Sequence, residues 1–318
     1  MDKGIERLRM ESALAWKLAV NVLGVDMDSP EAQQAASEVR QAALVRALIE
    51  TCDRRHSAYK KWDGAHWVLS ILADLGYPAG DEVLRPLMED VFETWLSKEH
   101  EARHLRMIDG RARRCASQEG NAIWSSLQLG LADSRTDELV NRLLKWQWPD
   151  GGWNCDKRPK ADTSSFMETL IPLRALALYA GLSGDARVRT AAERAAEVFL
   201  RRQLFKRQRD GKVMDRHFTL LHYPLYWHYD ILFGLKVMAE AGLIGDPRCR
   251  PALDLLESKR LPEGGFPAEE SYARTSRPDV SGYSPVSWGG TSRKKMNVFV
   301  TVDALYVLRV AGRLAVKK

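Results

Sequence analysis

The sequence predicts an all-α fold, an α/α toroid in which about five to six helical hairpins close into a barrel. Three observations predict it. A Gly-Asp motif recurs at long spacing, buried and half-exposed helices alternate, and no run keeps the period-two alternation of a β-strand. With 318 residues, the chain is expected to form one domain over residues 1–318 that encloses a sizeable core.

The repeated motif joins an apolar helix to the helix that follows it. Full copies begin at Gly80-Asp81, Gly184-Asp185 and Gly245-Asp246, and weaker copies lie at 129–133 and 301–312. The glycine permits a left-handed cap at the end of the first helix, and the aspartate can accept hydrogen bonds from the free N–H groups of the second. Gly80 and Gly184 lie 104 residues apart, or two units of 52, a length that suits helical hairpins.

The helices of the repeats differ in polarity. Residues 66–75 and 170–179 are apolar nearly all round, as expected of helices that are buried on both sides. Residues 191–204 instead carry charged side chains around an apolar stripe. This alternation predicts an inner and an outer ring of helices.

Two segments have a different character from the repeats. Residues 1–58 contain two expected helices, 11–22 and 31–49, which would complete the outer ring or cover one mouth of the barrel. Residues 268–295 are rich in Ser, Gly, Pro and Arg and have no helical period. They are expected to form a long loop and are a candidate lid.

Composition excludes several classes of protein. No stretch approaches the ~20 apolar residues of a membrane span, and the first residues lack the apolar core of a signal peptide, so we expect a cytoplasmic location. Four cysteines are scattered without a C-x-x-C pair, which argues against a disulfide framework and a zinc ribbon. A net charge of +6 is too mild to identify an anionic partner. We expect no nucleic-acid partner and leave peripheral contact with a membrane open.

A glycine-rich turn carries a family resemblance. Residues 147–153 read Gln-Trp-Pro-Asp-Gly-Gly-Trp and match the Q-x3-G-x-W repeat, or QW motif, of squalene and hopene cyclases. Residues 263–266 are similar to the Gly-Gly-Phe repeats of protein prenyltransferase β-subunits, and 163–170 look like the start of the next inner helix. Over most of residues 60–312 the chain resembles this terpenoid cyclase and prenyltransferase superfamily. In those families the QW motif is structural and ties one outer helix to its neighbour.

The catalytic motifs of those families are mostly absent. The string nearest to the Asp-x-Asp-Asp motif of protonation-initiated cyclases is Asp26-Met27-Asp28-Ser29, and no Asp-Asp-x-x-Asp string occurs. Residues 297–301, near the start of the closing helix, offer no histidine or cysteine for the zinc site of prenyltransferases. The resemblance therefore implies the fold without the standard active sites, and no cofactor is expected.

The candidate catalytic site lies where the inner helices begin, because in a toroid these helix ends converge on a central cavity. Residues 217–230 hold three of the seven histidines. Within this segment His228 is a candidate general acid or base, and Asp230 or another carboxylate would tune its proton state. His66 and Glu168 occupy similar places in other units and are further catalytic candidates.

Aromatic and amide side chains near the same helix ends are the candidate substrate-binding residues. They are Trp62, Asn121, Trp124, Tyr223, Tyr226, Trp227 and Trp288. Aromatic faces stabilise cations, which would suit carbocation or proton-transfer chemistry. Two other interpretations stay open. The histidines and Asp230 could bind a metal, for which the spacing gives weak support, or these side chains could plug the barrel without a catalytic role.

Three functions are compatible with these residues. The leading hypothesis is a cyclase or isomerase that acts by proton transfer on an isoprenoid or other apolar small molecule in the barrel lumen. If the substrate carries a diphosphate, Lys157, Arg158 and Lys160 would hold it. The first alternative is a polysaccharide lyase or hydrolase, against which the lack of a signal peptide argues. The second is a non-catalytic toroid that binds a lipid or a partner protein.

Overall fold

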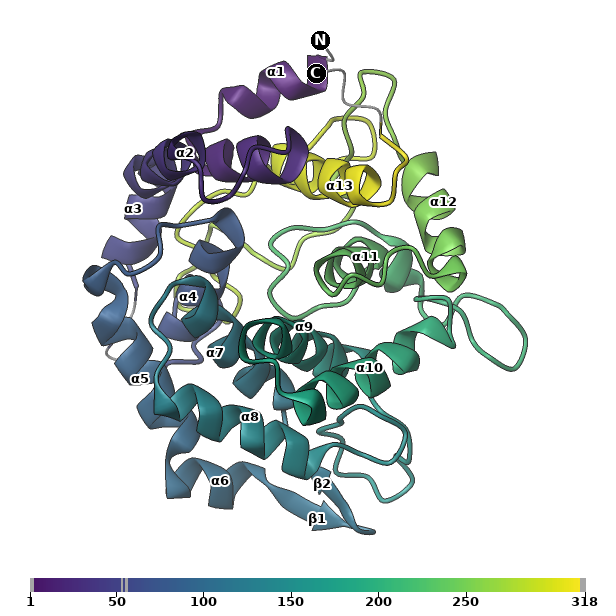
Figure 1. Ribbon diagram of the computed structural model, residues 1–318. Helices are drawn as coiled ribbons and strands as arrows, with labels where there is room; N and C mark the ends of the chain where they lie inside the picture. Colours follow the sequence, from purple (N-terminus) through teal and green to yellow (C-terminus); the bar gives the residue numbers. More distant parts are fainter. Residues whose placement is uncertain (1–2, 53, 55–56, 315–318) are drawn as a thin grey trace.

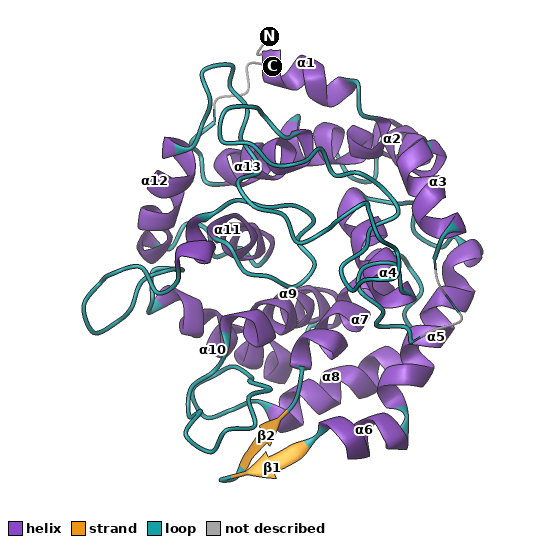
Figure 2. Ribbon diagram, turned by 180° about the vertical axis from the view of Figure 1, so that it is seen from behind, coloured by secondary structure: helices purple, strands orange, loops and turns teal. Residues whose placement is uncertain are grey.

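The computed structural model describes residues 3–52, 54 and 57–314, and it confirms the all-α toroid. Figures 1 and 2 show two concentric rings of helices, with α1 from the start of the chain lying beside α13 from its end. Within the described residues, the inner ring consists of η2 (Lys17–Val22), α4 (Ala65–Leu75), α7 (Ala116–Gln128), α9 (Phe166–Ser183), α11 (Ile231–Glu240) and α13 (Val298–Val310). The outer ring consists of α1 (Lys3–Arg9), α2 (Pro30–Gln41), α3 (Ala43–Glu50), α5 (Arg85–Leu96), α8 (Ser134–Trp146), α10 (Ala186–Leu200) and α12 (Arg250–Ser258).

The Gly-Asp motifs cap the helices as the sequence predicts. The carboxylates of Asp81, Asp185 and Asp246 each accept a hydrogen bond from the backbone N–H two residues further on. Gly184 ends α9 in the left-handed conformation with φ +72°, which a residue with a Cβ rarely adopts. In the copy at 129–133, Asp133 forms a capping box at the start of α8.

The N-terminal segment departs from the predicted pair of continuous helices. Residues 11–22 divide into a short 3₁₀ turn, η1 (Ser12–Leu14), and the π-helical η2, and the extended Ala42 separates α2 from α3. η2 packs against α13 in the inner ring, so this segment contributes to both rings instead of only the outer one. Residues 1–2, 53 and 55–56 of the predicted 1–58 segment lie outside the described residues.

Strands are short, as predicted. In the described part of the chain, β1 (Arg106–Ile108) and β2 (Arg111–Arg113) form an antiparallel hairpin beside α6 (Lys98–His104) at the edge of the ring (Figure 1). The remaining helical turns are η3 (Glu82–Leu84), η4 (Arg216–Thr219) and η5 (Pro247–Cys249). The described helices include none with both the length and the apolar character of a membrane span.

The QW turn ties two outer helices together. Gln147, which follows α8, donates hydrogen bonds from Nε2 to the carbonyls of Gly151 and of Ala191 in α10, both at 2.8 Å. Arg194 of α10 donates back to Gln147 Oε1 at 3.1 Å and to the Trp148 carbonyl at 3.0 Å. These bonds connect neighbouring hairpins and fix the chain that enters α9.

Candidate functional site

Side chains from the first turns of the inner helices meet at one mouth of the barrel, which we call the N-terminal mouth. His66 of α4 faces Asn121 of α7, with Nε2 and Nδ2 3.4 Å apart. Glu168 of α9 accepts a hydrogen bond from the backbone N–H of Ser117, at the start of α7, at 3.0 Å. The structure therefore brings His66, Asn121 and Glu168 to the same end of the barrel, as the sequence predicts.

His66 is enclosed by aromatic rings. Its Nδ1 accepts a hydrogen bond from Trp95 Nε1 at 3.3 Å, and its ring packs edge-on to Trp67 and Trp95. Because an indole N–H can only donate, Nδ1 of His66 is the acceptor in this contact. Burial lowers the pKa of His66 to about 3, so this histidine is neutral near pH 7.

Glu168 is a buried carboxyl with partners on both oxygens. Trp227 Nε1 donates to Oε1 at 3.1 Å, and the Sγ of Cys155 lies 3.7 Å from the same oxygen. Burial raises the pKa of Glu168, although the hydrogen bonds from Ser117 and Trp227 oppose the shift. The carboxyl thus lies at the N–H edge of the Trp227 indole at the mouth.

His228 lies against the 268–295 loop. Its imidazole stacks on the ring of Tyr272, with centroids 3.4 Å apart and planes inclined by 5°. Trp227 and Trp62 pack edge-on to it at 5.2 and 5.8 Å. Burial, together with the nearby His222, lowers the pKa of His228 to about 3, which keeps this half-buried ring neutral.

Asp230 is directed away from His228. Its carboxylate accepts hydrogen bonds from the Phe233 N–H at 2.8 Å, where it caps α11, and from the His222 N–H at 2.9 Å. It also contacts His222 Nδ1 at 2.7 Å. The carboxylate that the sequence assigned to tuning His228 is therefore paired with His222 and with the backbone.

The 268–295 loop covers the mouth. The Tyr272 carbonyl accepts a hydrogen bond from Trp62 Nε1 at 2.7 Å, and the Tyr283 carbonyl accepts one from the Trp62 backbone N–H at 2.8 Å. Gly282 N–H donates to the Lys61 carbonyl at 3.0 Å. The Trp62 ring stacks on Tyr226 with centroids 4.8 Å apart, so one aromatic layer joins the loop to the barrel.

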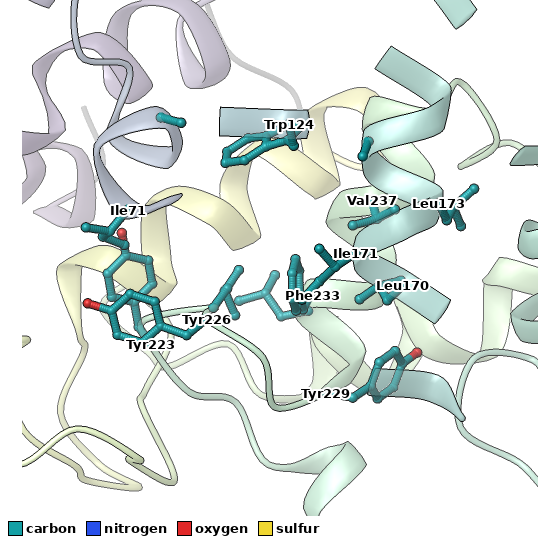
Figure 3. Packing of buried hydrophobic residues seen from close by; sticks show 14 of the residues in the cluster. Ile71, Trp124, Leu170, Ile171, Leu173, Tyr223, Tyr226, Tyr229, Phe233 and Val237 are labelled. Carbon is teal, nitrogen blue, oxygen red and sulfur yellow. The ribbon is translucent and has the colours of Figure 1, made fainter. Parts of the chain in front are cut away.

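The other predicted binding residues lie deeper. The ring of Trp124 packs on the guanidinium of Arg174 at 3.4 Å, and Tyr223 stacks on Phe299 at 4.9 Å. Trp288 packs edge-on to Tyr223. Figure 3 shows Trp124, Tyr223 and Tyr226 among the buried side chains. The predicted substrate-binding set therefore divides into a mouth group and an interior group.

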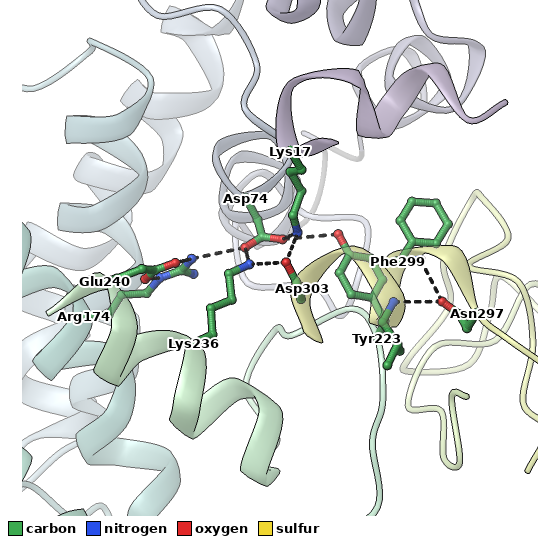
Figure 4. A network of polar contacts seen from close by, with 10 residues as sticks. Lys17, Asp74, Arg174, Tyr223, Lys236, Glu240, Asn297, Phe299 and Asp303 are labelled. Carbon is green, nitrogen blue, oxygen red and sulfur yellow. Dashed lines mark hydrogen bonds and ion pairs between the residues drawn. The ribbon is translucent and has the colours of Figure 1, made fainter. Parts of the chain in front are cut away.

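The interior of the barrel is closed by ion pairs (Figure 4). Asp74 contacts the amines of Lys17 and Lys236 at 2.9 and 2.5 Å and the guanidinium of Arg174 at 3.2 Å. Asp303 contacts the same two lysine amines at 2.5 and 2.9 Å. The cavity beside this network, lined in part by Asp74, Asn121 and Trp124, has a volume of about 10 Å³. It is hardly large enough for one water molecule.

The mouth, by contrast, opens into a hollow. This hollow has a volume of about 810 Å³ and is lined by Ser57, Tyr59, Lys60, Lys61 and residues 278–281. The Lys61 amine lies over the rings of Trp62 and Trp227, at 5.1 and 4.9 Å from their centroids. Burial lowers the pKa of Lys61. A volume of several hundred Å³ is typical of ligand sites, and here aromatic rings and amines meet at its edge.

Sequence reasoning missed two residues of the mouth. It treated Cys115 and Cys155 as scattered, but their thiols lie beside Glu168. The neighbouring backbones run side by side, because Arg114 N–H donates to the Asn154 carbonyl at 3.2 Å. The available signal was positional: Cys115 directly precedes an inner helix, and Cys155 follows the QW turn that leads into the next.

Comparison with known proteins identifies similar architectures only. No family model matches the sequence, and no curated protein matches it. Among solved structures, unsaturated glucuronyl hydrolase from Bacillus sp. GL1 aligns over 94% of this chain and 84% of its own, with 15% identity and a TM-score of 0.44. A structure of UGL with dGlcA-Glc-Rha-Glc aligns over the same shares, with 14% identity and a TM-score of 0.44. A protein from Actinoplanes aligns over 95% and 90%, with 18% identity and a TM-score of 0.41.

The closed lumen corrects the leading functional hypothesis. A terpenoid cyclase or isomerase that holds an isoprenoid in its lumen is contradicted, because paired charges occupy the space that an apolar ligand would need. The cavity beside these ion pairs has a volume of only about 10 Å³. The expected apolar or isoprenoid small-molecule ligand is contradicted together with this hypothesis. The proposed role of Lys157, Arg158 and Lys160 in holding a diphosphate is withdrawn with it. These three side chains are exposed, and Arg158 pairs with Asp156.

Proposed function

We propose that this chain is a hydrolase that acts on an acidic oligosaccharide at the N-terminal mouth. The hollow of about 810 Å³, with its aromatic edge and with Lys61, is the observation that carries the proposal. Flat aromatic rings pack well against the apolar faces of sugar rings, and lysine amines attract the carboxylate of a uronic acid. This is the first alternative that the sequence left open, narrowed to hydrolysis.

The aromatic layer would provide the sugar-binding surface. Trp227 is half-buried and lies under the Lys61 amine, so a sugar ring stacked on this indole would place its carboxylate within reach of that cation. The neutral imidazole of His228 would accept or donate a hydrogen bond to a sugar hydroxyl. We expect the 268–295 loop to lift when substrate enters, because it lies across these groups.

Of the four predicted catalytic residues, Glu168 is the one we assign to the reaction, since it is hydrogen-bonded to Trp227 of the proposed sugar-binding surface. His66 and Asp230 would position other groups. His66 faces Asn121, and Asp230 holds His222 and caps α11. His228 would contact substrate without changing its charge, because its pKa of about 3 keeps it neutral.

The resemblance of residues 147–153 to the QW motif supports a proposal about structure and not about catalysis. The bonds from Gln147 to Gly151 and Ala191 tie adjacent outer helices, which is the role of the QW motif in the families that carry it. We infer that the motif is retained here for stability, while the site at the mouth has a different chemistry.

Activity on uronic acid oligosaccharides tests the proposed function. The protein is incubated with unsaturated uronyl disaccharides and with saturated acidic oligosaccharides, and ultraviolet absorbance reports the C4–C5 double bond of the sugar. A hydrolase releases the unsaturated sugar, which then opens to a keto form without this double bond, so the absorbance falls. A lyase creates the double bond, so the absorbance rises. We expect a fall in absorbance and a gain of reducing ends, and we expect Glu168→Gln to lower kcat at least 100-fold.

A matched variant separates recognition from reaction. Lys61→Ala is expected to weaken binding of the acidic substrate about fivefold, as for loss of a partly exposed charge contact, and to leave neutral saccharides unaffected. Turnover of neutral sugars alone would contradict the acidic substrate class. Saccharide binding without turnover would replace the proposed hydrolase with a non-catalytic binding protein.

A further inference from the structure

Two thiols and a carboxyl converge at the N-terminal mouth. The Sγ atoms of Cys115 and Cys155 and a carboxylate oxygen of Glu168 all lie within 4.8 Å of one another. In the part of the chain that the structure describes, this is the one group of three or more His, Cys, Asp or Glu side chains with such spacing. The histidines of residues 217–230, which the sequence considered for a metal, do not form such a group there.

The backbone fixes all three positions. Cys115 is the cap residue of α7, and a parallel bridge between Arg113 and Asn154 places it next to Cys155. Glu168 lies in the first turn of α9 and is held by the Ser117 N–H at 3.0 Å. Three segments that are distant in sequence thus place these two thiols and the carboxyl together, on two helix starts and a tied turn.

We propose that Cys115, Cys155 and Glu168 bind a zinc ion. Thiolates and carboxylates are zinc ligands, and Zn–S and Zn–O bonds of about 2.3 and 2.0 Å put tetrahedral ligand atoms about 3.3–3.8 Å apart. Cys155 Sγ and Glu168 Oε1 already lie 3.7 Å apart. The remaining pairs, at up to 4.8 Å, close by about 1 Å when the cysteine side chains rotate.

The surroundings suit a bound ion. The cluster is half-buried to buried, which limits competition from water. Trp227 Nε1 and the Ser117 N–H hold the two carboxylate oxygens of Glu168, as hydrogen bonds to metal ligands commonly do. Two thiols and a carboxyl at this spacing repel one another once they lose their protons, and a dication would turn that repulsion into coordination.

Three protein ligands leave the fourth position of a tetrahedral ion for water or substrate, which is the arrangement of catalytic zinc sites. Bound zinc lowers the pKa of such a water and makes it a nucleophile near neutral pH. Zinc binding itself goes beyond the proposed function and does not depend on it. If both hold, the ion would supply the hydrolytic water, and Glu168 would act as its ligand.

Metal content of the purified full-length chain is the direct test. The protein is stripped with a chelator, reconstituted with Zn²⁺ alone, desalted and analysed for metal, and its affinity is measured by competition with a chromogenic chelator. Wild type and Cys52→Ser, a cysteine outside the cluster, are expected to bind about one zinc per chain. Cys115→Ser and Cys155→Ser are expected to lose at least tenfold in affinity.

A second measurement needs no substitution. Zn²⁺ should protect two thiols of folded wild type from a chromogenic thiol reagent, and Co²⁺ should give a thiolate-to-metal charge-transfer band that Cys155→Ser loses. Wild type without bound zinc after reconstitution, unprotected thiols, or a disulfide between Cys115 and Cys155 by mass spectrometry would overturn the site. Zinc binding without saccharide cleavage retains this site and rejects the proposed function. Saccharide cleavage by a protein that takes up no zinc on reconstitution retains the proposed function and rejects this site.

Discussion

The centre of the barrel and its N-terminal mouth both bury polar side chains, but they pair them differently. At the centre every charge meets an opposite charge, as when Asp74 contacts Lys17, Lys236 and Arg174. At the mouth, His66 and His228 are neutral rings packed on aromatic neighbours, and Glu168 is bonded to neutral donors. Charges that are fully paired stabilise the fold, whereas groups with neutral partners are still able to bind a ligand or transfer a proton.

This contrast is the reason that we place the proposed substrate site at the mouth and not in the lumen. Burial opposes ionisation of Asp74, but the charges of Lys17, Lys236 and Arg174 hold its pKa well below the usual range. A ligand that entered this region would have to separate these ion pairs in a medium of low dielectric, which is costly. The loop-covered hollow outside the aromatic layer carries no such cost.

The largest effect is expected from breaking the central network. Asp74→Ala leaves Lys17 and Lys236 with one shared carboxylate and removes a partner of Arg174, so we expect a loss of about 3–5 kcal/mol in the free energy of unfolding. Urea unfolding followed by circular dichroism measures it. Asp254→Ala, which removes an exposed partner of Arg313, is the control and should cost less than about 1 kcal/mol. Equal losses in the two variants would mean that the central pairs contribute no more than surface ones.

A smaller loss in the free energy of unfolding is expected at low pH, because of His66. Its pKa of about 3 in the folded chain lies below the unfolded value of 6.5, so the unfolded chain binds the extra proton as pH falls below 6.5. Stability is therefore full above pH 6.5 and declines toward pH 3, by about 2 kcal/mol at pH 5 for this residue alone. His66→Gln should flatten the pH dependence of unfolding between pH 7 and 5. An unchanged slope would show that His66 titrates normally.

The smallest effect on stability is expected at the loop. Tyr272→Ala removes the ring stacked on His228, which is expected to lower the free energy of local opening of the loop by about 0.5–1.5 kcal/mol. Because the stack fastens the 268–295 loop, limited proteolysis within this loop should accelerate while global unfolding hardly changes. Tyr179→Ala, at a partly buried tyrosine bonded to Asp137 and remote from this loop in sequence, is a matched control that should leave loop cleavage unchanged.

Local sequence patterns predict the fold well because each hairpin is built from short-range rules. The aspartates of the Gly-Asp motif cap their helices as predicted, and the apolar segment 66–75 matches the inner helix Ala65–Leu75. The π-helical turn at Lys17–Val22 is not predictable from local pattern. Its conformation accompanies contacts of Lys17 with Asp74 and Asp303, which are remote in sequence.

The site is less predictable for the same physical reason. Helix starts identify His66, Glu168 and their shared end of the barrel, because inner helices of a toroid run in parallel. The direction of a side chain depends on tertiary contacts, so Asp230 turns to His222 instead of His228. Cys115 and Cys155 come together only because two hairpins pack side by side, and their spacing in the sequence does not predict this contact.

Hydrogen–deuterium exchange with and without an acidic oligosaccharide tests the central claim, that the mouth and not the lumen is the functional site. We predict that a uronic acid oligosaccharide slows exchange in residues 57–62 and in the 268–295 loop, and leaves the middle of α9 and α13 unchanged. Slower exchange confined to the segments around Arg174 and Asp303 would contradict the claim. So would unchanged exchange throughout the chain with the oligosaccharide in large excess.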